Sequence, residues 1–233
     1  MRKPYQIVIL PGLDGTGIML QRFAAALAAD FRVKTICYPP LEPLNYDGLL
    51  EWVRQQLPAN DFIVIGESFS GPLALRLGQE RIPGLQGIIL GASFAKLDVP
   101  LKFVMKRLAR MVSPRLIPSR MLTAYLMGKG ATPELRQQLK EVLRTVASKV
   151  WQVRAAEALS VDLFASGQTI SQPVLYLRAT KDQLVPKSAA QRLAGIAPDL
   201  FICDIDAPHF LFQLAYEDCI AAIRHFSKRL AEK

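Results

Sequence analysis

Three side chains of this sequence could together perform nucleophilic catalysis: Ser68, Asp182 and His209. A serine hydroxyl needs a neighbouring general base before it can attack a carbonyl carbon, and histidine is a common base. A carboxylate beside that histidine fixes its tautomer and stabilises the imidazolium that forms. The three residue types therefore indicate acyl transfer through a covalent acyl-enzyme, provided that the fold brings them together.

Ser68 lies between two segments of different pattern. The apolar run 62–65 predicts a buried strand, and residues 72–80 predict a helix. A strand that turns sharply into a helix holds a serine in a strained conformation and exposes its hydroxyl at the carboxyl edge of a sheet. Gly66 and Ser70 are small, as expected where strand and helix nearly touch. We therefore interpret this stretch as a nucleophile elbow.

The chain has two histidines, His209 and His225. His225 lies within the last helical pattern, between Ile223 and Phe226, which indicates a structural role. His209 follows the last predicted strand, and the loop after a strand's carboxyl end is where sheet enzymes place working groups. Without Ser68 we would interpret His209 as a helix-start residue bonded to backbone. With Ser68, it is the candidate base.

The acid predicted to orient His209 is Asp182. It directly follows the predicted strand 174–178, so its loop should face the same sheet edge as Ser68. A turn aspartate that caps the next helix is the alternative interpretation. Four further acids lie near the histidine or at the edges of the central helical region: Asp98, Asp162, Asp204 and Asp206.

Strands and helices alternate at both ends of the chain. The strand patterns are 5–10, 31–37, 61–65, 85–90, 174–178 and 200–205, and the helical patterns include 18–29, 46–57, 69–80, 186–194 and 210–230. Alternation of this kind predicts an α/β fold: a three-layer, doubly wound, mostly parallel sheet of about six strands.

The alternation stops near Ala95 and resumes near Pro173. Helical patterns fill the gap at 101–112, 115–127, 133–147 and 151–163. We predict an α/β core at 1–94 and 172–233 with a helical cap at 95–171. Four of the six methionines lie in this cap (Met105, Met111, Met121 and Met127), where they should form an adaptable apolar wall over Ser68.

The order Ser68, Asp182, His209 resembles that of the α/β-hydrolase family. The resemblance runs from the first strand to the last helix. The family's Gly-x-Ser-x-Gly pattern reads G-E-S-F-S here, with Ser70 in place of the last glycine. Asp182 has Val-Pro three residues later, and His209 stands between proline and phenylalanine. The resemblance implies a serine esterase or thioesterase, with six strands because the family's first two are missing.

The loop after the first strand reads P-G-L-D-G-T-G, where the family often carries His-Gly. The resemblance implies that the backbone amides of Leu13 and Phe69 hold the oxyanion. A phosphate-cradling loop is the competing interpretation. The spacing of Gly12, Gly15 and Gly17 does not match the dinucleotide fingerprint, and no Lys-Ser/Thr follows. We therefore predict no cofactor.

Cysteine and histidine content gives two further expectations. The three cysteines, odd in number and widely spaced, predict buried thiols in a reducing compartment. Without paired Cys or His spacing, no metal site is expected.

The start of the chain lacks a signal-peptide core, and no apolar run approaches the ~20 residues of a membrane span. We therefore predict a cytoplasmic protein.

Positive charge is concentrated in one part of the chain. Residues 96–154 contain 13 Lys/Arg and 3 Asp/Glu, a net charge of +10, whereas the whole chain has +9. Beyond a small ester or thioester substrate, this charge could attract an acyl carrier protein, coenzyme A or an anionic lipid surface. A merely solvated face is the alternative. The patch lacks a nucleic-acid-reading motif, so no nucleic acid partner is expected.

Two other functions stay open. The same triad could perform acyl transfer to an alcohol, and the fold could serve as a non-catalytic binding protein. The sequence does not indicate an oligomeric state.

Overall fold

The computed structural model describes residues 5–98, 102–109, 111 and 117–232. At its centre is a six-stranded sheet in the order β2-β1-β3-β4-β5-β6, and every neighbouring pair is parallel. The strands are β1 (Gln6–Leu10), β2 (Arg32–Thr35), β3 (Phe62–Glu67), β4 (Leu85–Gly91), β5 (Val174–Ala179) and β6 (Leu200–Ile205). The predicted α/β class and strand number are confirmed.

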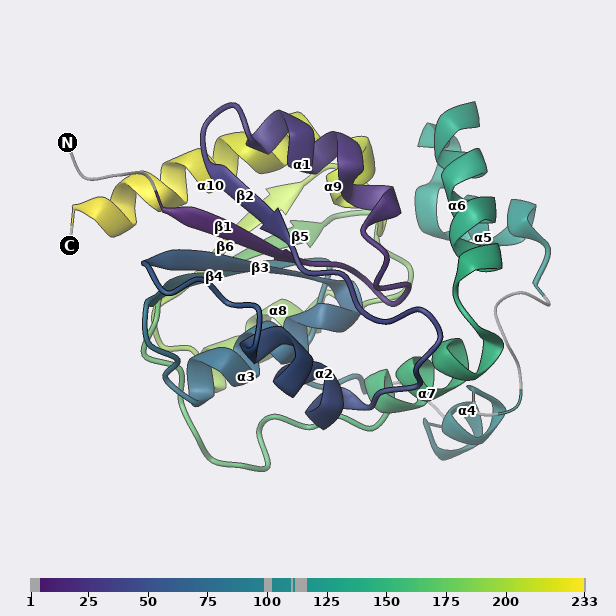
Figure 1. Cartoon of the computed structure of the whole chain (residues 1–233), viewed down its shortest axis with the longest axis horizontal. Helices are drawn as coiled ribbons and strands as arrows, with labels where there is room; N and C mark the ends of the chain where they lie inside the picture. Colours follow the sequence, from purple (N-terminus) through teal and green to yellow (C-terminus); the bar gives the residue numbers. More distant parts are fainter. Residues whose placement is uncertain (1–4, 99–101, 110, 112–116, 233) are drawn as a thin grey trace.

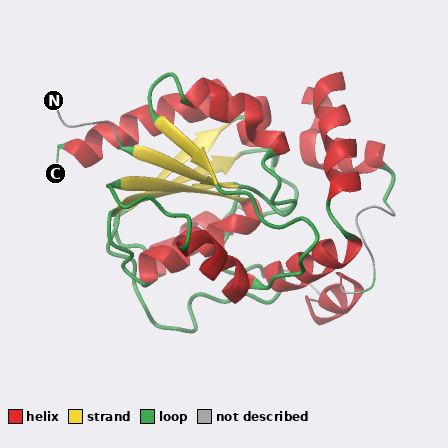
Figure 2. Ribbon diagram, viewed as in Figure 1, coloured by secondary structure: helices red, strands yellow, loops and turns green. Residues whose placement is uncertain are grey.

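Helices cover both faces of the sheet, which gives three layers (Figures 1 and 2). One face carries α2 (Tyr46–Arg54), α3 (Gly71–Gln79), α8 (Ser188–Arg192) and the short η5 (Leu193–Gly195). The other carries η1 (Ile18–Leu20), α1 (Gln21–Leu27), α9 (Leu211–Leu214) and α10 (Tyr216–Ala231). Because side chains alternate along a strand, Val8 of β1 packs into the first layer and Ile7 into the second.

The long terminal helix predicted over 210–230 is two helices. The chain leaves helical geometry at Ala215, whose φ is −132° and ψ is 41°. The break separates α9, which packs Phe212 against Phe23 of α1 at a centroid distance of 4.5 Å, from α10, which runs along the sheet.

Between β4 and β5 lie α4 (Lys102–Ala109), α5 (Ser119–Met127), η4 (Gly128–Gly130), α6 (Pro133–Thr145) and α7 (Ser148–Ala158). We call α4 to α7 the intervening helices. They stand at one end of the sheet, away from both termini (Figure 1). Positions 101, 110, 112, 115 and 116 of the predicted helices lie outside the described residues. Within the described ranges, no helix is long and apolar enough to cross a membrane.

The prediction of buried thiols is wrong for one cysteine. Cys219 is buried, Cys203 is half-buried and Cys37 is exposed. Cys37 follows β2 in the loop at the sheet's carboxyl edge, where its Sγ contacts the carbonyl of Thr16 at 3.0 Å. Its position after the strand, outside the two packed layers, explains the exposure.

Candidate active site

Ser68 lies at the sharp turn between β3 and α3, as the first residue of η2 (Ser68–Ser70). Its φ of 47° is in the left-handed region, which a residue with a Cβ rarely adopts. A Cβ on Gly66 would lie 2.8 Å from the carbonyl oxygen of Ser70, so the helix passes too close to β3 for any side chain there. The turn leaves Ser68 partly exposed at the end of a fully buried strand.

The structure brings Ser68, His209 and Asp182 into one hydrogen-bonded line. Ser68 Oγ lies 2.9 Å from His209 Nε2, and His209 Nδ1 lies 2.8 Å from Asp182 Oδ2. An ionised carboxylate can only accept, so Nδ1 donates to Asp182 and Nε2 is left to accept from the serine hydroxyl. The His209 and Asp182 side chains are both buried, which protects this line from water.

Backbone amides hold Asp182 in place. The amides of Leu184 and Val185 donate to Asp182 Oδ1 at 2.7 and 3.1 Å, which leaves Oδ2 for the imidazole. Asp182 therefore fits both interpretations: one carboxylate oxygen accepts from the turn amides, and the other faces His209. The alternative acids pair elsewhere: Asp204 with Arg178, Asp206 with Lys181, Asp98 with Arg192 and Asp162 with Lys96.

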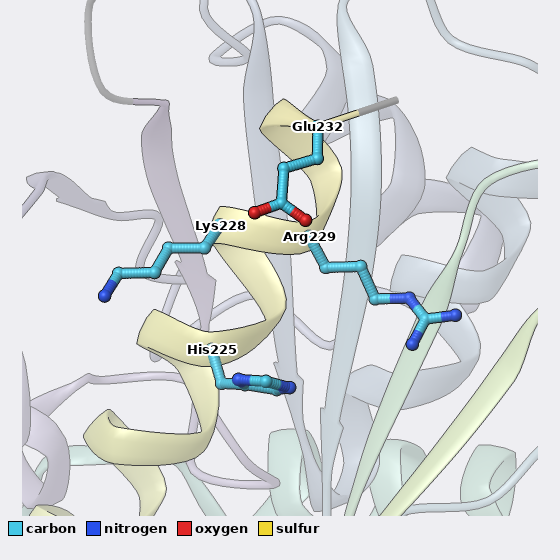
Figure 3. A pocket seen from close by; sticks show the side chains of 4 residues that line it. All are labelled: His225, Lys228, Arg229 and Glu232. Atoms are coloured by element: carbon cyan, nitrogen blue, oxygen red, sulfur yellow. The ribbon is translucent and has the colours of Figure 1, made fainter.

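His225 is remote from this line. It lies on the exposed side of α10, where it borders a shallow pocket with Lys228, Arg229 and Glu232 (Figure 3). The carboxyl end of α10 is on the opposite side of the molecule from the intervening helices (Figure 1). Among the described residues, no group of His, Cys, Asp or Glu side chains is arranged to hold a metal ion.

The loop after β1 is attached to the elbow through Glu67. The amide of Gly12 donates to Glu67 Oε2 at 2.9 Å, and Gln213 of α9 donates to Glu67 Oε1 at 2.7 Å. The Leu13 amide, the predicted oxyanion donor, has no acceptor among the described residues. Glu67 thus links Ser68, the loop that contains Leu13 and the segment that carries His209.

Ser70 forms a second link between the elbow and this loop. Its hydroxyl donates to the carbonyl of Pro11 and lies 2.6 Å from the hydroxyl of Tyr38. In the sequence pattern, Ser70 is a small residue in place of the last glycine. The structure adds a role that glycine could not fill, because glycine has no hydroxyl to bind Pro11. Phe69, the other predicted donor, is held by Tyr46, which stacks on its ring and donates to its carbonyl at 2.8 Å.

Arg154 of α7 also binds the loop after β1. Its guanidinium donates to the carbonyls of Leu13 at 3.2 Å, Asp14 at 2.6 Å and Pro39 at 3.0 Å. The residue is fully buried, and no described carboxylate forms an ion pair with it. Burial lowers its pKa to about 10, so it remains charged at neutral pH. Arg154 is one of the 13 basic residues of segment 96–154, but because it is buried it adds no charge to a basic surface.

A usable signal for the burial of Arg154 exists in the sequence. Val150 and Trp151 precede it by four and three residues, so all three share one helical face. Both apolar neighbours are buried. An arginine that continues an apolar stripe is a candidate for an internal role.

The intervening helices contact the candidate site directly. Tyr125 of α5 donates to the carbonyl of Gln183, next to Asp182, at 2.7 Å. The amide of Phe210, next to His209, donates to the carbonyl of Leu126 at 3.2 Å. Of the four methionines expected to form an apolar wall, only Met127 is buried; the other three are exposed.

Glu67 also gives the site a predicted pH dependence. Burial raises the pKa of Glu67 to about 7 from 4.5, although the bonds from Gln213 and Gly12 act against the increase. A raised carboxyl pKa favours folding below about pH 4.5, and this contribution is lost as the pH rises to about 7. The difference of roughly 2.5 pH units corresponds to about 3 kcal/mol of unfolding free energy.

We therefore expect Glu67→Gln to be more stable than the wild type at pH 8, by up to about 3 kcal/mol, and much closer to it at pH 5. The introduced amide has no charge to desolvate. When the Gln213 amide turns over, Gln213 Oε1, a buried atom that lacks a partner in the described structure, can accept from the new amide. Urea unfolding of both proteins at the two pH values measures this. An equal stability difference at both pH values would contradict it.

A parallel six-stranded sheet, with a serine at the turn after a central strand and its histidine and acid after later strands, defines the α/β-hydrolase class. Residues 45–202 match the family described as serine aminopeptidase, S33, and the chain belongs to this family. The resemblance inferred from sequence is thereby confirmed.

Two relatives align over nearly the whole chain. Phytyl ester synthase 1, chloroplastic, from Arabidopsis thaliana is 26% identical over 93% of this chain. The biotin biosynthesis bifunctional protein BioHC from Cellvibrio japonicus is 24% identical over 98% of it. The chain spans only 36% and 43% of the length of these two relatives.

Solved structures agree with the fold. The enol-lactonase from Burkholderia xenovorans LB400 superposes with a TM-score of 0.78 at 16% identity, covering 96% of this chain and 91% of that one. A thermophilic esterase from Thermogutta terrifontis gives 0.78 at 17% identity, covering 98% and 91%. At these identities the likeness establishes the fold alone.

Proposed function

We propose that this chain is a serine hydrolase that cleaves carboxylic esters or thioesters through an acyl-enzyme on Ser68. The observation that carries the proposal is the unbroken line from Ser68 Oγ through His209 to Asp182. The named relatives fit the proposal, since one is an ester synthase and one structural neighbour is an esterase.

The proposed reaction has two halves. His209 Nε2 takes the proton from Ser68 Oγ as the oxygen attacks the substrate carbonyl. The Leu13 and Phe69 amides hold the resulting oxyanion. When the tetrahedral intermediate collapses, His209 gives its proton to the leaving alkoxide or thiolate. Water, deprotonated by His209, then attacks the acyl-enzyme; this releases the acid and restores the Ser68 hydroxyl.

The helices at 95–171 are proposed to act as a cap that borders the acyl site. Their own apolar cluster includes Met127 and Trp151 and packs against Leu13, a proposed oxyanion donor, and Phe210, which follows His209. An apolar acyl group is the substrate part that such surroundings favour. The leaving group could be an alcohol, coenzyme A or the thiol of an acyl carrier protein.

The test is a panel of purified substrates: p-nitrophenyl esters of increasing chain length, acyl-coenzyme A thioesters and an aminoacyl anilide. We expect ester or thioester cleavage and stoichiometric labelling of Ser68 by a fluorophosphonate. A folded protein that neither cleaves any ester or thioester nor takes the label would overturn the proposal in favour of a non-catalytic binding protein. Cleavage of the anilide alone would indicate peptidase activity.

Acyl transfer is the second candidate, because the name of the Arabidopsis relative describes ester synthesis. Both reactions share the acyl-enzyme and differ in whether water or an alcohol attacks it. Product analysis with and without a long-chain alcohol separates them. If transfer is the activity, ester product should accumulate and free acid should fall as alcohol is added. Unchanged release of free acid would exclude transfer to that acceptor.

A further inference from the structure

Helix α4 turns its apolar side chains toward solvent. Phe103, Val104 and Leu108 are exposed, and so is Met111, which follows the helix. Phe103 is 80% exposed and Met111 is 69% exposed. At about 100° per residue, Phe103, Val104 and Leu108 lie within an arc of roughly 140°, and Arg107 lies within the same arc.

The partly buried positions of α4 are on the other side of the helix. Lys106 and Ala109 have intermediate exposure, and α4 packs against α7 (Figure 1). A surface helix normally buries its apolar stripe and exposes its charges. In α4 the apolar stripe is exposed instead, and Lys106 lies on the partly buried side. A group of large apolar side chains left outside in this way marks an interaction surface.

The charge of the surrounding segment limits what the partner can be. Residues 99–133 contain seven Lys/Arg and no Asp/Glu. In the described structure, Lys106, Arg107, Arg120 and Lys129 form no ion pair with an acid. A second copy of the chain, related by a twofold axis, would place this basic segment against itself. The partner must therefore be apolar and anionic together.

We propose that α4 and Met111 bind an anionic lipid surface. Phe103, Leu108 and Met111 enter the interface, and Arg107 meets the headgroup phosphates from within the apolar arc. An apolar face with interspersed basic residues is typical of helices that lie in the plane of a membrane surface. The interaction requires no membrane-spanning segment.

This surface is connected to the candidate active site through α7. α4 packs against α7, and Arg154 of α7 donates to the carbonyls of Leu13 and Asp14. Lipid docking would thus hold the site close to apolar esters dissolved in the membrane. That consequence for substrate choice rests on the proposed function, whereas lipid binding itself does not.

The test measures binding separately from catalysis. Wild-type protein and Ser68→Ala are sedimented with vesicles of phosphatidylcholine alone, or of phosphatidylcholine mixed with phosphatidylglycerol. We expect both proteins to bind the mixed vesicles, more weakly as salt is raised, and to bind the neutral vesicles poorly. Failure of wild type to bind either vesicle overturns the proposal, even if soluble esters are cleaved.

Single substitutions test whether the lipid-binding surface lies on α4. Phe103→Asp should lower partitioning onto mixed vesicles by at least about tenfold, because an apolar anchor is lost and a negative charge is added. Arg107→Glu should also weaken binding. Lys228→Glu, an exposed charge reversal in the last turn of α10, is the matched control and should bind as wild type does, because this end of α10 is on the opposite side of the molecule from α4 (Figure 1). Circular dichroism and the Tm verify folding, and Phe103→Ala serves if the aspartate variant is unstable.

The same variants, together with two further measurements, distinguish a lipid from other binding partners of this surface. Binding of Phe103→Asp equal to that of wild type overturns the assignment to α4, as does an equal loss in Lys228→Glu. If size-exclusion chromatography finds a dimer that Phe103→Asp dissociates, the occupant is a second copy and the lipid proposal fails. Binding to an acidic acyl carrier protein without vesicle binding would assign the surface to a protein partner instead.

Discussion

Ser68→Ala is expected to lower kcat for ester hydrolysis by about 10⁴-fold or more. The substitution removes the only atom that can form the proposed acyl-enzyme, while His209 and Asp182 remain in place. Labelling by a fluorophosphonate should be abolished. The Tm should change little, because the backbone keeps the left-handed conformation at this position and, among the described residues, the hydroxyl hydrogen-bonds only to His209.

Ser188→Ala is the matched control for this prediction. Ser188 is exposed at the start of α8, so removing its hydroxyl should alter neither hydrolysis nor labelling. Initial rates on a short p-nitrophenyl ester and mass spectrometry of the labelled protein provide the two measurements. Retention of more than a few per cent of wild-type kcat by Ser68→Ala, or labelling at another residue, would contradict the assigned nucleophile.

The sheet and the positions of Ser68, Asp182 and His209 could be predicted because their signals are local. Each strand is a short apolar run, and each of the three residues directly follows one of these runs. Parallel strands present their carboxyl ends at one edge, so topology alone brings loops distant in sequence together. No side-chain contact had to be inferred to place the three residues at the same edge.

The supporting contacts could not be predicted in the same way. Glu67 meets Gly12 and Gln213 across 55 and 146 residues, and Ser70 meets Pro11 across 59. A glutamate or serine in a turn is compatible with exposure, a cap or a buried bond, and its immediate neighbours do not distinguish these. Only the packed loop determines which bond forms. The exposed apolar stripe of α4 escaped prediction for a related reason, since its pattern defines an apolar face but not the direction that face takes.

Arg154 is the residue whose replacement gives the second large expected effect. Three carbonyls from two loops converge on its planar guanidinium, and the Leu13 carbonyl belongs to the residue whose amide is the proposed oxyanion donor. Close packing leaves the loop little freedom to find another arrangement. A Cβ on Gly15 would lie only 2.6 Å from an Arg154 nitrogen and 2.7 Å from the ring of Tyr38.

We expect Arg154→Lys to lower kcat by about 10²-fold, with KM changed much less. Lysine keeps the positive charge but has one ammonium in place of a rigid fork, so it cannot hold carbonyls of both loops at once. A displaced Leu13 amide weakens oxyanion binding, which matters in the transition state more than in the ground-state complex. Arg154 acts here as a positioning residue, because it contacts the loop and not the reacting atoms.

Two comparisons separate positioning from simple loss of structure. Arg136→Lys, at an exposed position on α6, should leave kcat unchanged. Arg154→Met removes the charge as well as the fork. If kcat falls because the loop is displaced, the methionine and lysine variants should lose similar amounts of kcat. If kcat falls because the positive charge is lost, the lysine variant should keep its activity. Each rate is divided by the concentration of protein that a fluorophosphonate labels at Ser68, so that unfolded molecules do not lower the kcat obtained. A folded, fully titratable Arg154→Lys with wild-type kcat would exclude the positioning role, because the loop would then hold its donor without the guanidinium.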